Sequence, residues 1–231
     1  MNKRESELKF TCEAFSAPFI KRGIESVCIA DSNFSENVIS SVYFDTSDWL
    51  FAMEKASSDY LKSKVRLRWY ESSHKNDNQK SSKCYLEFKQ KIGSKRTKNR
   101  ILMPFSGDHA LQSLAEVECQ EMIQQHIKEQ APELSGYNVT PKFVVRYSRS
   151  RFDEPFSNTR ISFDTGIHAF SVSNDCPQQA THVFLTESVL EVKGKVDDLP
   201  CPLRSFHGGK LRKAAFSKYF ESFKLISGYE Q

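Results

Sequence analysis

The sequence predicts an α+β fold with about eight strands, most of them antiparallel. Several segments alternate apolar and polar residues, as strands with one buried face do. Hairpin-length gaps separate several of these segments, which favours antiparallel pairing. One long segment, 108–130, instead repeats its apolar residues near helical spacing. Because no internal repeat or linker is visible, we expect residues 1–231 to form a single domain.

The N-terminal half predicts strands that alternate with short helices. Residues 13–30 predict a helix that is interrupted near Pro18 and followed by an apolar segment. The polar turn at 45–48 predicts a cap for a short helix that runs through Met53. A polar loop with no apolar residue lies at 72–82. The strands expected in this half are 5–11, 38–46, 64–71, 83–91 and 95–104.

The C-terminal half predicts further strands after the amphipathic helix at 108–130. In that helix Leu111, Leu114 and Val117 begin the apolar stripe. Two prolines, Pro200 and Pro202, break the chain, and a Gly-Gly pair precedes an expected final helix at 210–226. The strands expected here are 142–152, 159–165 and 183–193.

One face of several of these strands is crowded with Lys and Arg. The clearest case is the segment 64–70, in which successive side chains point to opposite faces. The apolar face there consists of Val65, Leu67 and Trp69. The opposite face consists of Lys64, Arg66, Arg68 and Tyr70.

The same segregation of charge recurs on five other strand segments. The twelve cations on the six faces are Lys9, Lys64, Arg66, Arg68, Lys83, Lys89, Lys91, Arg149, Arg151, Arg160, Lys193 and Lys195. The six acids on these faces are Glu5, Glu7, Glu87, Asp153, Asp164 and Glu191. The whole chain has 33 cations to 29 acids, so an ordinary solvated face would mix the signs more evenly. The partner of such a surface is expected to be a polyanion.

A closed barrel is the arrangement that we expect to use this cationic face. Eight strands can close so that the polar face lines a tunnel and helices cover the apolar exterior. A dozen cations inside a tunnel are costly unless carboxylates, water or a bound anion compensate them. Six acids do not balance twelve cations, which favours a polyphosphate ligand. A nucleic-acid duplex would not fit inside an eight-stranded barrel, whereas a single phosphate chain would.

The composition excludes several other classes of protein. The net charge of +4 is weak for a general nucleic-acid binder, and we expect no DNA partner. Six scattered Cys without a CxxC pair favour a reducing, cytoplasmic setting without a zinc site, and Cys84 is expected to be a buried thiol. We see no signal peptide and no apolar run long enough to span a membrane. No Walker A loop or GxGxxG motif is present.

Seven motifs in a fixed order resemble a known family. They are SVYFDT (41–46), KVRLRWY (64–70), YLEFKQK (85–91), VVRYSRSRFD (144–153), RISFDT (160–165), LEVKGK (190–195) and FSKYF (216–220). Together they resemble the VTC domain, the vacuolar transporter chaperone polyphosphate polymerase domain of the triphosphate tunnel metalloenzyme superfamily. The resemblance spans roughly residues 5–222. It implies an eight-stranded antiparallel tunnel that binds triphosphates, and transfer of the terminal phosphate of ATP to polyphosphate with a divalent metal, Mn²⁺ or Mg²⁺.

The resemblance also implies roles for individual residues. The expected catalytic cations are Lys9, Arg66, Arg68, Lys89, Arg149, Arg160 and Lys218. The expected substrate-binding residues are Lys98, Tyr147, Lys193 and Ser217. The expected metal ligands are Glu191, then Glu5 and Glu7. Arg suits two-pronged contacts with phosphate oxygens, Lys suits point charges, and carboxylates suit a hard divalent ion.

The first strand also resembles another branch of the superfamily. Glu5, Glu7 and Lys9 complete the E-x-E-x-K pattern of the CYTH branch, which favours triphosphate hydrolysis with Glu5 and Glu7 as further metal ligands. The Ser217-Lys218-Tyr219 motif and the strand around Glu191 favour the VTC branch instead.

Each candidate also has a purely structural interpretation. Arg66 and Arg68 would then belong to a solvated strand face, and Glu191 would form a salt bridge with a neighbouring Lys. Lys218 would be a helix-surface lysine, and Tyr147 a packing residue. Glu5 and Glu7 would lie on a frayed, exposed N-terminal strand.

Three functional hypotheses follow from the sequence. The first is a metal-dependent phosphotransferase that makes polyphosphate from ATP. The second is a hydrolase of tripolyphosphate or of a nucleoside triphosphate on the same tunnel. The third is a non-catalytic module that binds polyphosphate or RNA. The sequence does not show whether a membrane partner receives the product.

Overall fold

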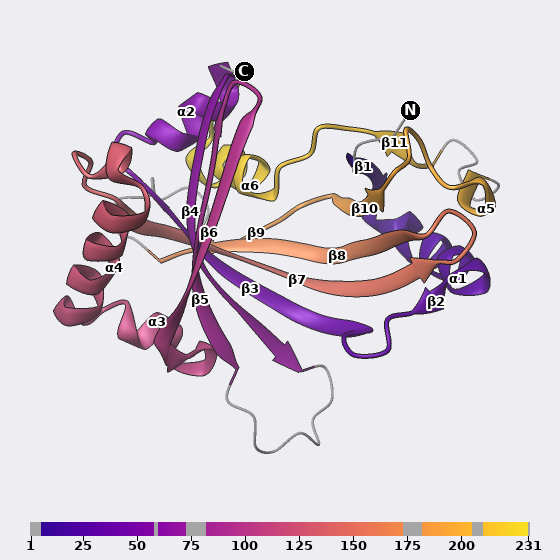
Figure 1. Cartoon of the computed structure of the whole chain (residues 1–231), viewed down its shortest axis with the longest axis horizontal. Helices are drawn as coiled ribbons and strands as arrows, with labels where there is room; N and C mark the ends of the chain where they lie inside the picture. Colours follow the sequence, from indigo (N-terminus) through magenta and orange to yellow (C-terminus); the bar gives the residue numbers. More distant parts are fainter. Residues whose placement is uncertain (1–5, 58–59, 73–81, 173–181, 205–209, 231) are drawn as a thin grey trace. The chain divides into compact units, whose positions relative to one another are not determined.

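The structure is a computed structural model that describes residues 6–57, 60–72, 82–172, 182–204 and 210–230 (Figure 1). The chain divides into two compact units, each assembled from three separate segments. The first unit contains residues 1–38, 147–168 and 184–218. The second unit contains residues 39–146, 169–183 and 219–231. Three long strands, β3 (Glu36–Asp45), β7 (Thr140–Glu154) and β8 (Thr159–Ser171), contribute residues to both units.

The sheet of the first unit follows the strand order β11-β1-β10-β8-β7. Its other strands are β1 (Ser6–Glu13), β10 (Glu187–Gly194), β11 (Arg212–Lys213) and β2 (Ile29–Ala30), which pairs with β7. β1 runs antiparallel to β10, with Lys9 opposite Glu191, and antiparallel to β11, with Thr11 opposite Arg212. β1 therefore lies between β10 and β11, with Glu191 of β10 beside Lys9 and Arg212 of β11 beside Thr11.

The apolar face of this sheet is covered by helices α1 (Ala17–Val27) and α5 (Cys201–Arg204). Ile20 and Ile24 of α1 are buried against Phe10 and Leu190 of the strands. Helix η1 (Ala14–Ser16) connects β1 to α1. Since the helices bury one face of β1 and β10, the opposite face, which carries Lys9 and Glu191, remains polar.

The sheet of the second unit follows the order β7-β3-β4-β5-β6. Its other strands are β4 (Leu61–Ser72), β5 (Lys83–Ile92) and β6 (Lys95–Ser106), and the short β9 (His182–Phe184) pairs with β8. The helices with residues in this unit are α2 (Leu50–Ser57), η2 (Gly107–His109), α3 (Ala110–Ser113), α4 (Val117–Gln130), η3 (Pro132–Leu134) and α6 (Lys218–Ser227), whose first residue belongs to the first unit.

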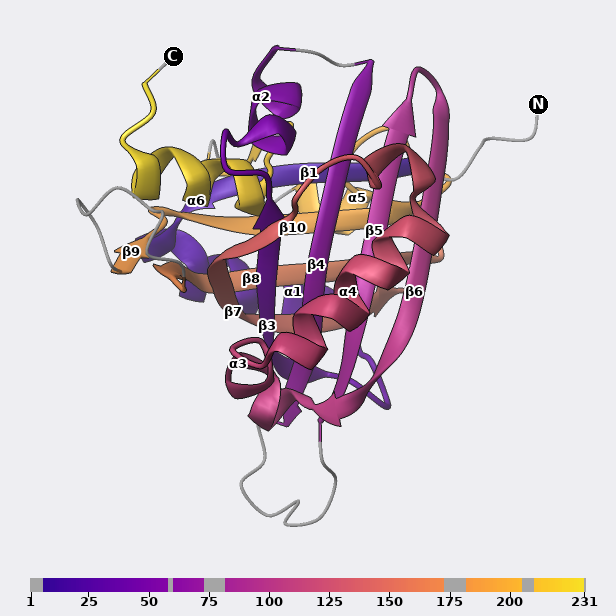
Figure 2. The same ribbon diagram turned by 90° about the vertical axis from the view of Figure 1, so that its left-hand side faces the viewer.

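Helix α4 covers the apolar face of strands β4, β5 and β6 (Figure 2). Ile123 and Ile127 of the helix are buried, as are Val65 and Leu67 of β4. The C-terminal end of α4 is held by the side-chain amide of Asn99 in β6, which donates to the carbonyl of Gln130 at 3.2 Å. The predicted division of strand 64–70 into an apolar and a cationic face is thereby confirmed.

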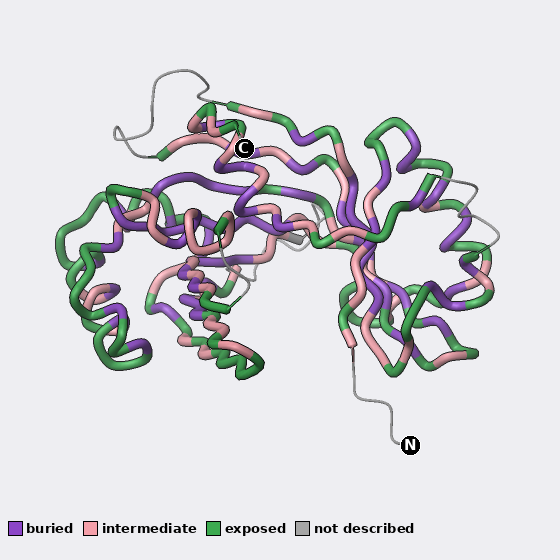
Figure 3. The backbone as a smooth tube through the Cα atoms, turned by 90° about the horizontal axis from the view of Figure 1, so that it is seen from above, coloured by how far each residue is buried: buried purple, intermediate pink, exposed green. Residues whose placement is uncertain are grey.

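Burial alternates as predicted at the start of β5, whereas residues 39–45 of β3 and 188–192 of β10 are buried without alternation (Figure 3). In β5, Cys84 and Leu86 are fully buried while Lys83 and Lys89 are exposed. The prediction that Cys84 is a buried thiol is confirmed, and burial raises its pKa to about 12. In the part of the chain that the structure describes, no helix is long and apolar enough to cross a membrane.

The expectation of eight strands in a closed barrel is wrong in both count and closure. The described residues form eleven strands in an open order that ends at β11 and β6. The additional strands, β2, β9 and β11, are two or three residues long, which is too short for an alternating pattern. Closure depends on the stagger summed over every strand pair, and alternation within single strands does not encode it.

Two helix predictions at the N-terminal and central segments need correction. Pro18 does not interrupt a helix but lies in the first turn of α1, where its missing N–H is not needed. The segment 108–130 is not one helix, since α3 and α4 are separated at 114–116. Buried positions advance by five residues from Leu114 to Cys119, which would rotate the buried face of a continuous helix.

The final helix begins eight residues later than the predicted start at 210. Arg212 and Lys213 form β11 instead, and the backbone N–H of Ala214 donates to the carbonyl of Lys9 at 3.0 Å. An available edge of β1 therefore outweighs the local helical propensity of this segment. Helix α6 starts only at Lys218.

Candidate active site

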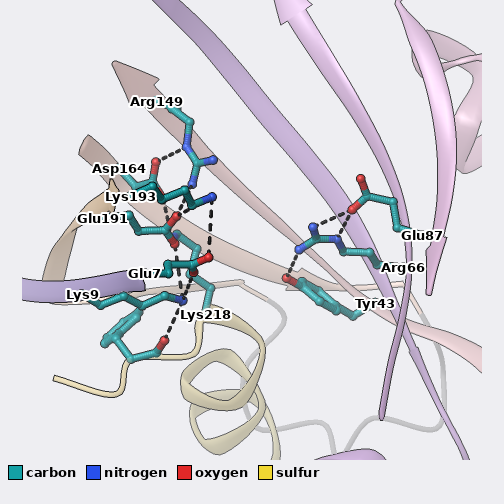
Figure 4. Close-up of polar contacts among 11 residues, drawn as sticks. Glu7, Lys9, Tyr43, Arg66, Glu87, Arg149, Asp164, Glu191, Lys193 and Lys218 are labelled. Carbon is teal, nitrogen blue, oxygen red and sulfur yellow. Dashed lines mark hydrogen bonds and ion pairs between the residues drawn. The ribbon is translucent and has the colours of Figure 1, made fainter. Parts of the chain in front are cut away.

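The first unit gathers cations and acids on the polar face of its sheet, in a group that we call the β1–β10 cluster (Figure 4). Its members are Glu7, Lys9, Arg149, Asp164, Glu191, Lys193 and Lys218. Strand register explains the grouping, because Glu7 lies opposite Lys193 and Lys9 lies opposite Glu191. Opposite residues in an antiparallel pair project to the same face, so their charges meet.

Glu191 lies among the cations of this cluster. One carboxylate oxygen is 3.4 Å from Lys9 Nζ, and the other is 3.7 Å from Arg149 Nη2 and 3.8 Å from Lys193 Nζ. Burial alone would raise the pKa of this carboxyl, but Lys218, Lys9, Arg149 and Lys193 together hold the pKa well below its usual range. Glu191 is therefore ionised throughout the physiological range.

Asp164 of strand β8 holds Arg149 from a second side and also binds Lys218. Arg149 donates through Nε and Nη2 to the two carboxylate oxygens at 2.5 and 2.6 Å, and Lys218 Nζ lies 2.5 Å from Oδ2. Asp164 is fully buried, and burial would raise its pKa, but Lys218 and Arg149 lower it. A two-pronged contact of this kind fixes the plane of the guanidinium group.

Tyr147 lies beneath the same two cations. Lys218 Nζ is 4.7 Å from the centre of its ring, and the guanidinium carbon of Arg149 is 5.4 Å from it. The ring is buried and offers its aromatic face to the two cations. Their ion pairs are still made with the carboxylates. Burial would lower the pKa of Lys218, but Asp164, Tyr147 and Glu191 raise it, so this lysine stays charged.

The second unit carries a separate group, the β4–β5 cluster, which consists of Ser41, Tyr43, Arg66, Arg68, Glu87 and Lys89. Arg66 donates through Nε and Nη2 to one oxygen of Glu87 at 2.8 and 2.6 Å, and through Nη1 to the hydroxyl of Tyr43 at 3.2 Å (Figure 4). Arg68 Nε donates to the hydroxyl of Ser41 at 2.9 Å. Neighbouring strands β3, β4 and β5 thus hold both guanidinium groups in place.

Burial and neighbouring charges shift the pKa values of two groups in the β4–β5 cluster, Glu87 and Lys89. Burial would raise the pKa of Glu87, but Arg66 and Arg68 lower it to about 2. Burial and repulsion by Arg66 and Arg68 lower the pKa of Lys89 to about 7. Since the Lys89 side chain is open to solvent, we expect hydration to restrain this lowering. An anion bound beside Lys89 would favour its charged form.

Comparison with known proteins decides the family of the chain. The family model of the VTC domain matches residues 4–227. The chain belongs to the VTC domain family. No curated protein matches this VTC domain.

Several solved structures have a distant likeness to this VTC domain, among them three from different organisms. A candidate adenylate cyclase from Bacillus halodurans is 13% identical with a TM-score of 0.45, covering 98% of this chain and 93% of that one. A candidate adenylate cyclase from Vibrio parahaemolyticus is 15% identical with a TM-score of 0.41, covering 86% and 79%. The Schizosaccharomyces pombe Mediator head module is 12% identical with a TM-score of 0.37, covering 97% and 95%. These identities and TM-scores are too low to support an inference about fold or function.

The other predicted site residues lie on the expected strand faces or nearby. Lys98 of β6 lies directly opposite Lys89 and is exposed, and Arg160 of β8 lies opposite Lys193 and is exposed. Ser217 is buried immediately before α6. Glu5 lies outside the described residues. The roles of these residues in the VTC domain stay predictions.

The described carboxylates of this VTC domain do not fit a divalent metal ion as they are arranged. Both oxygens of Glu7 lie 3.7 Å from a lysine, Lys9 or Lys193, and these two lysines also face Glu191. Within the described part of the chain, no group of three or more His, Cys, Asp and Glu is placed to hold a metal. A cation there would meet the positive charges of the lysines first.

Four residues of the two clusters were not among the predicted site residues. The sequence shows Asp164 and Glu87 as acids on cationic faces, and that position is the signal by which they could have been found. Tyr43 lies in SVYFDT next to a buried aromatic, and nothing local distinguishes it from a core residue. Ser41 likewise gives no signal in the sequence. Their importance follows from the neighbouring strand, which supplies their partners.

Proposed function

We propose that this VTC domain transfers the terminal phosphate of ATP to the end of a polyphosphate chain. The observation that carries the proposal is the β1–β10 cluster, in which four cations are held on one sheet face by three carboxylates. Phosphoryl transfer needs little covalent help from a protein. It depends on positioned cations that neutralise the phosphate oxygens, which such a cluster provides.

The transfer forms one P–O bond and breaks another. A terminal oxygen of polyphosphate attacks the γ-phosphorus, and the bond between this phosphorus and the β–γ bridging oxygen breaks. ADP leaves with the electron pair of that bond. Arg149 is suited to two-pronged contact with the transferred phosphoryl group, while Lys9 and Lys218 supply point charges. The carboxylates that face these cations keep them in place before substrate binds.

The low pKa values of the carboxylates in the β1–β10 cluster support a phosphate acceptor over water. Water needs a base to accept its proton, whereas a phosphate oxygen is already anionic. The pKa values of Glu191 and Asp164 are lowered by neighbouring cations, above all Lys218, which outweigh the effect of burial. Both are therefore weak bases and suit charge balance rather than activation of water.

Lys89 supports the hydrolase as the second candidate. Burial and the neighbouring Arg66 and Arg68 lower its pKa, so a larger share of this amine is neutral than in a free lysine, and a neutral amine accepts a proton from water. Lys89→Arg tests this role, because Arg keeps the charge but does not act as a base. We expect the variant to retain ADP release that depends on a polyphosphate acceptor. Loss of that activity together with loss of phosphate release to water would contradict transfer as the main reaction.

Acceptor dependence provides the direct test of the proposed function. Purified protein is given ATP with and without short polyphosphate, and ADP and free phosphate are measured separately. We expect polyphosphate to accelerate ADP release without matching release of free phosphate. Lys218→Met should lower this rate by about 100-fold or more, since one positioned cation is removed. Lys195→Met is the control, because Lys195 is exposed beyond the end of β10.

Two other outcomes would decide against the proposal. Free phosphate equal to ADP, with or without acceptor, would show a hydrolase. ATP binding without either product would show a binding module. The dependence on Mn²⁺ or Mg²⁺ stays a prediction from the resemblance, and the same assay with each metal and with a chelator tests it.

A further inference from the structure

The first unit contains a cavity of about 710 Å³ at the C-terminal end of β1, outside the ion pairs of the β1–β10 cluster. Its volume falls in the range of small-molecule sites. The lining residues that matter for its chemistry are Thr11, Glu13, Phe15, Glu187, Lys210 and Arg212. All of them belong to the same compact unit as Lys9 and Glu191.

The cavity continues the strand face on which the cluster lies. Side chains of β1 alternate, so Lys9, Thr11 and Glu13 project to one face and follow each other at about 7 Å. Arg212 lies opposite Thr11 in β11 and therefore shares this face. A ligand whose phosphates reach Lys9 can consequently extend its other end into the cavity.

Two of the charged residues that line the cavity are acids, which disfavour a bare phosphate chain. Glu13 lies directly opposite Glu187, and like charges in such a pair are destabilising. Thr186 donates to one oxygen of Glu187 at 3.0 Å, which leaves the acids with capacity to accept more hydrogen bonds. A polyphosphate would be repelled by both acids. An uncharged group that donates hydrogen bonds would satisfy them.

The aromatic and basic residues complete this chemistry. Phe15 is 80% exposed, so the faces of its ring are open to a stacking partner. Lys210 and Arg212 are exposed cations at the same cavity, and the Lys210 ammonium lies 4.2 Å from the ring centre of Phe19. An aromatic base with an amino donor, joined to phosphates through a sugar with hydroxyl donors, matches the ring, the acids and the cations at once.

We propose that this cavity binds the nucleoside end of a nucleoside triphosphate whose phosphates extend along β1 toward Lys9. The inference rests on the proposed function, because it assigns the donor substrate to that same strand face. It also assigns a specificity: the base and sugar are recognised at the cavity, and tripolyphosphate, which lacks them, does not use it.

Calorimetric titration of ATP and of tripolyphosphate tests the assignment in two matched variants. Phe15→Ala removes the exposed ring, and Phe156→Ala removes a ring that is 84% exposed in the turn between β7 and β8 of the same unit. Loss of one base-stacking contact should weaken ATP binding about tenfold or more in Phe15→Ala. Tripolyphosphate binding should be unchanged, and Phe156→Ala should alter neither ligand.

The failures of the two proposals are distinguishable. If Phe15→Ala leaves ATP affinity unchanged, or weakens both ligands equally, the nucleoside assignment is wrong and the proposed function stands. If the unmodified protein binds neither ATP nor tripolyphosphate, both proposals fall.

Glu13→Gln provides a second readout at an exposed position. We expect weaker ATP binding, because the amide of Gln accepts hydrogen bonds less strongly than the carboxylate of Glu13. The affinity for tripolyphosphate should not fall. Equal strengthening of both ligands would show that the cavity receives phosphates, which would overturn the nucleoside assignment.

Discussion

Glu191 is the carboxylate that the cations of the β1–β10 cluster share. Lys9, Arg149 and Lys193 all lie within 3.8 Å of its oxygens, and the side chain is only 9% exposed. Removing one partner from a buried group of charges costs far more than removing an exposed one, because the remaining charges are left without compensation. The residue thus holds cations together before substrate arrives.

Glu191→Gln should lower the free energy of unfolding by about 3–5 kcal/mol in the absence of ligand. About 1 kcal/mol corresponds to about 2–4 °C in Tm for a chain of this size, so differential scanning calorimetry resolves the change. Tripolyphosphate should raise the Tm of the variant more than that of the unmodified protein, since a bound anion replaces the lost charge.

Glu7→Gln is the matched control for this substitution. Glu7 faces the same two lysines but its side chain is 44% exposed, so we expect a change of about 1 kcal/mol or less. An equal loss of stability in Glu7→Gln and Glu191→Gln would show that burial does not determine the balance of the cluster.

The ion pair of Glu87 should make the free energy of unfolding depend on pH in the acid range. Its folded pKa of about 2 lies below the value of about 4.3 for a free Glu carboxyl. Because the folded pKa is lowered, the stabilisation is complete above the free value and is lost as the pH falls from there toward 2. We expect Glu87→Gln to be less stable than the unmodified protein at pH 7, and the difference to narrow toward pH 2. A difference that is constant with pH would refute the ion pair with Arg66.

At the scale of elements, β11 connects the first strand to the lysine of α6. Its two residues pair with Phe10 and Thr11, and the N–H of Ala214 donates to the carbonyl of Lys9. The chain then reaches Phe216, whose carbonyl accepts from Lys9 Nζ at 3.4 Å. This short edge strand therefore fixes both the backbone and the side chain of Lys9.

Ala214→Pro should release this edge because proline has no N–H to donate. We expect a loss of about 1–3 kcal/mol in the free energy of unfolding, and weaker tripolyphosphate binding. Ala214→Ser keeps the donor and should behave like the unmodified protein in the same denaturation and calorimetry experiments. Equal behaviour of the proline and serine variants would show that the hydrogen bond to Lys9 has no influence on the site.

Sequence patterns predicted the long elements and missed the short ones. The alternation in 64–70 and 83–91 identified strands and their buried faces, because each strand has enough residues to show the period. The two residues of β11 have no period, and their pairing with β1 depends on a partner about 200 positions away in the chain. The break between α3 and α4 was visible only once the buried positions were known.

The same limit applies to the candidate site. The cations of the strand faces could be predicted because each strand displays them in order, and the register brings Lys9 to Glu191 and Lys98 to Lys89. Partners such as Tyr43 and Ser41 could not be predicted, since their side chains acquire a role only beside Arg66 and Arg68 of the neighbouring strand. Long-range pairing, rather than local pattern, completes both clusters.

At the scale of the whole molecule, the strand order corrects the expected barrel. The path from β11 to β6 is open in the described chain, and each compact unit carries its own cluster of cations and acids. The prediction that residues 1–231 form one domain, and the proposal of a polyphosphate-making VTC domain, concern the chain as a unit. Both are properties that no single strand reveals.

The most direct measurement is a polyacrylamide gel, stained for polyphosphate, of the products that the purified protein makes from ATP and manganese. We expect a ladder of chains whose phosphate content matches the ADP released. Lys218→Met should greatly weaken the ladder, while Lys195→Met should not. Free phosphate without a ladder, or intact ATP in a mixture where ATP is bound, would contradict phosphate transfer to polyphosphate.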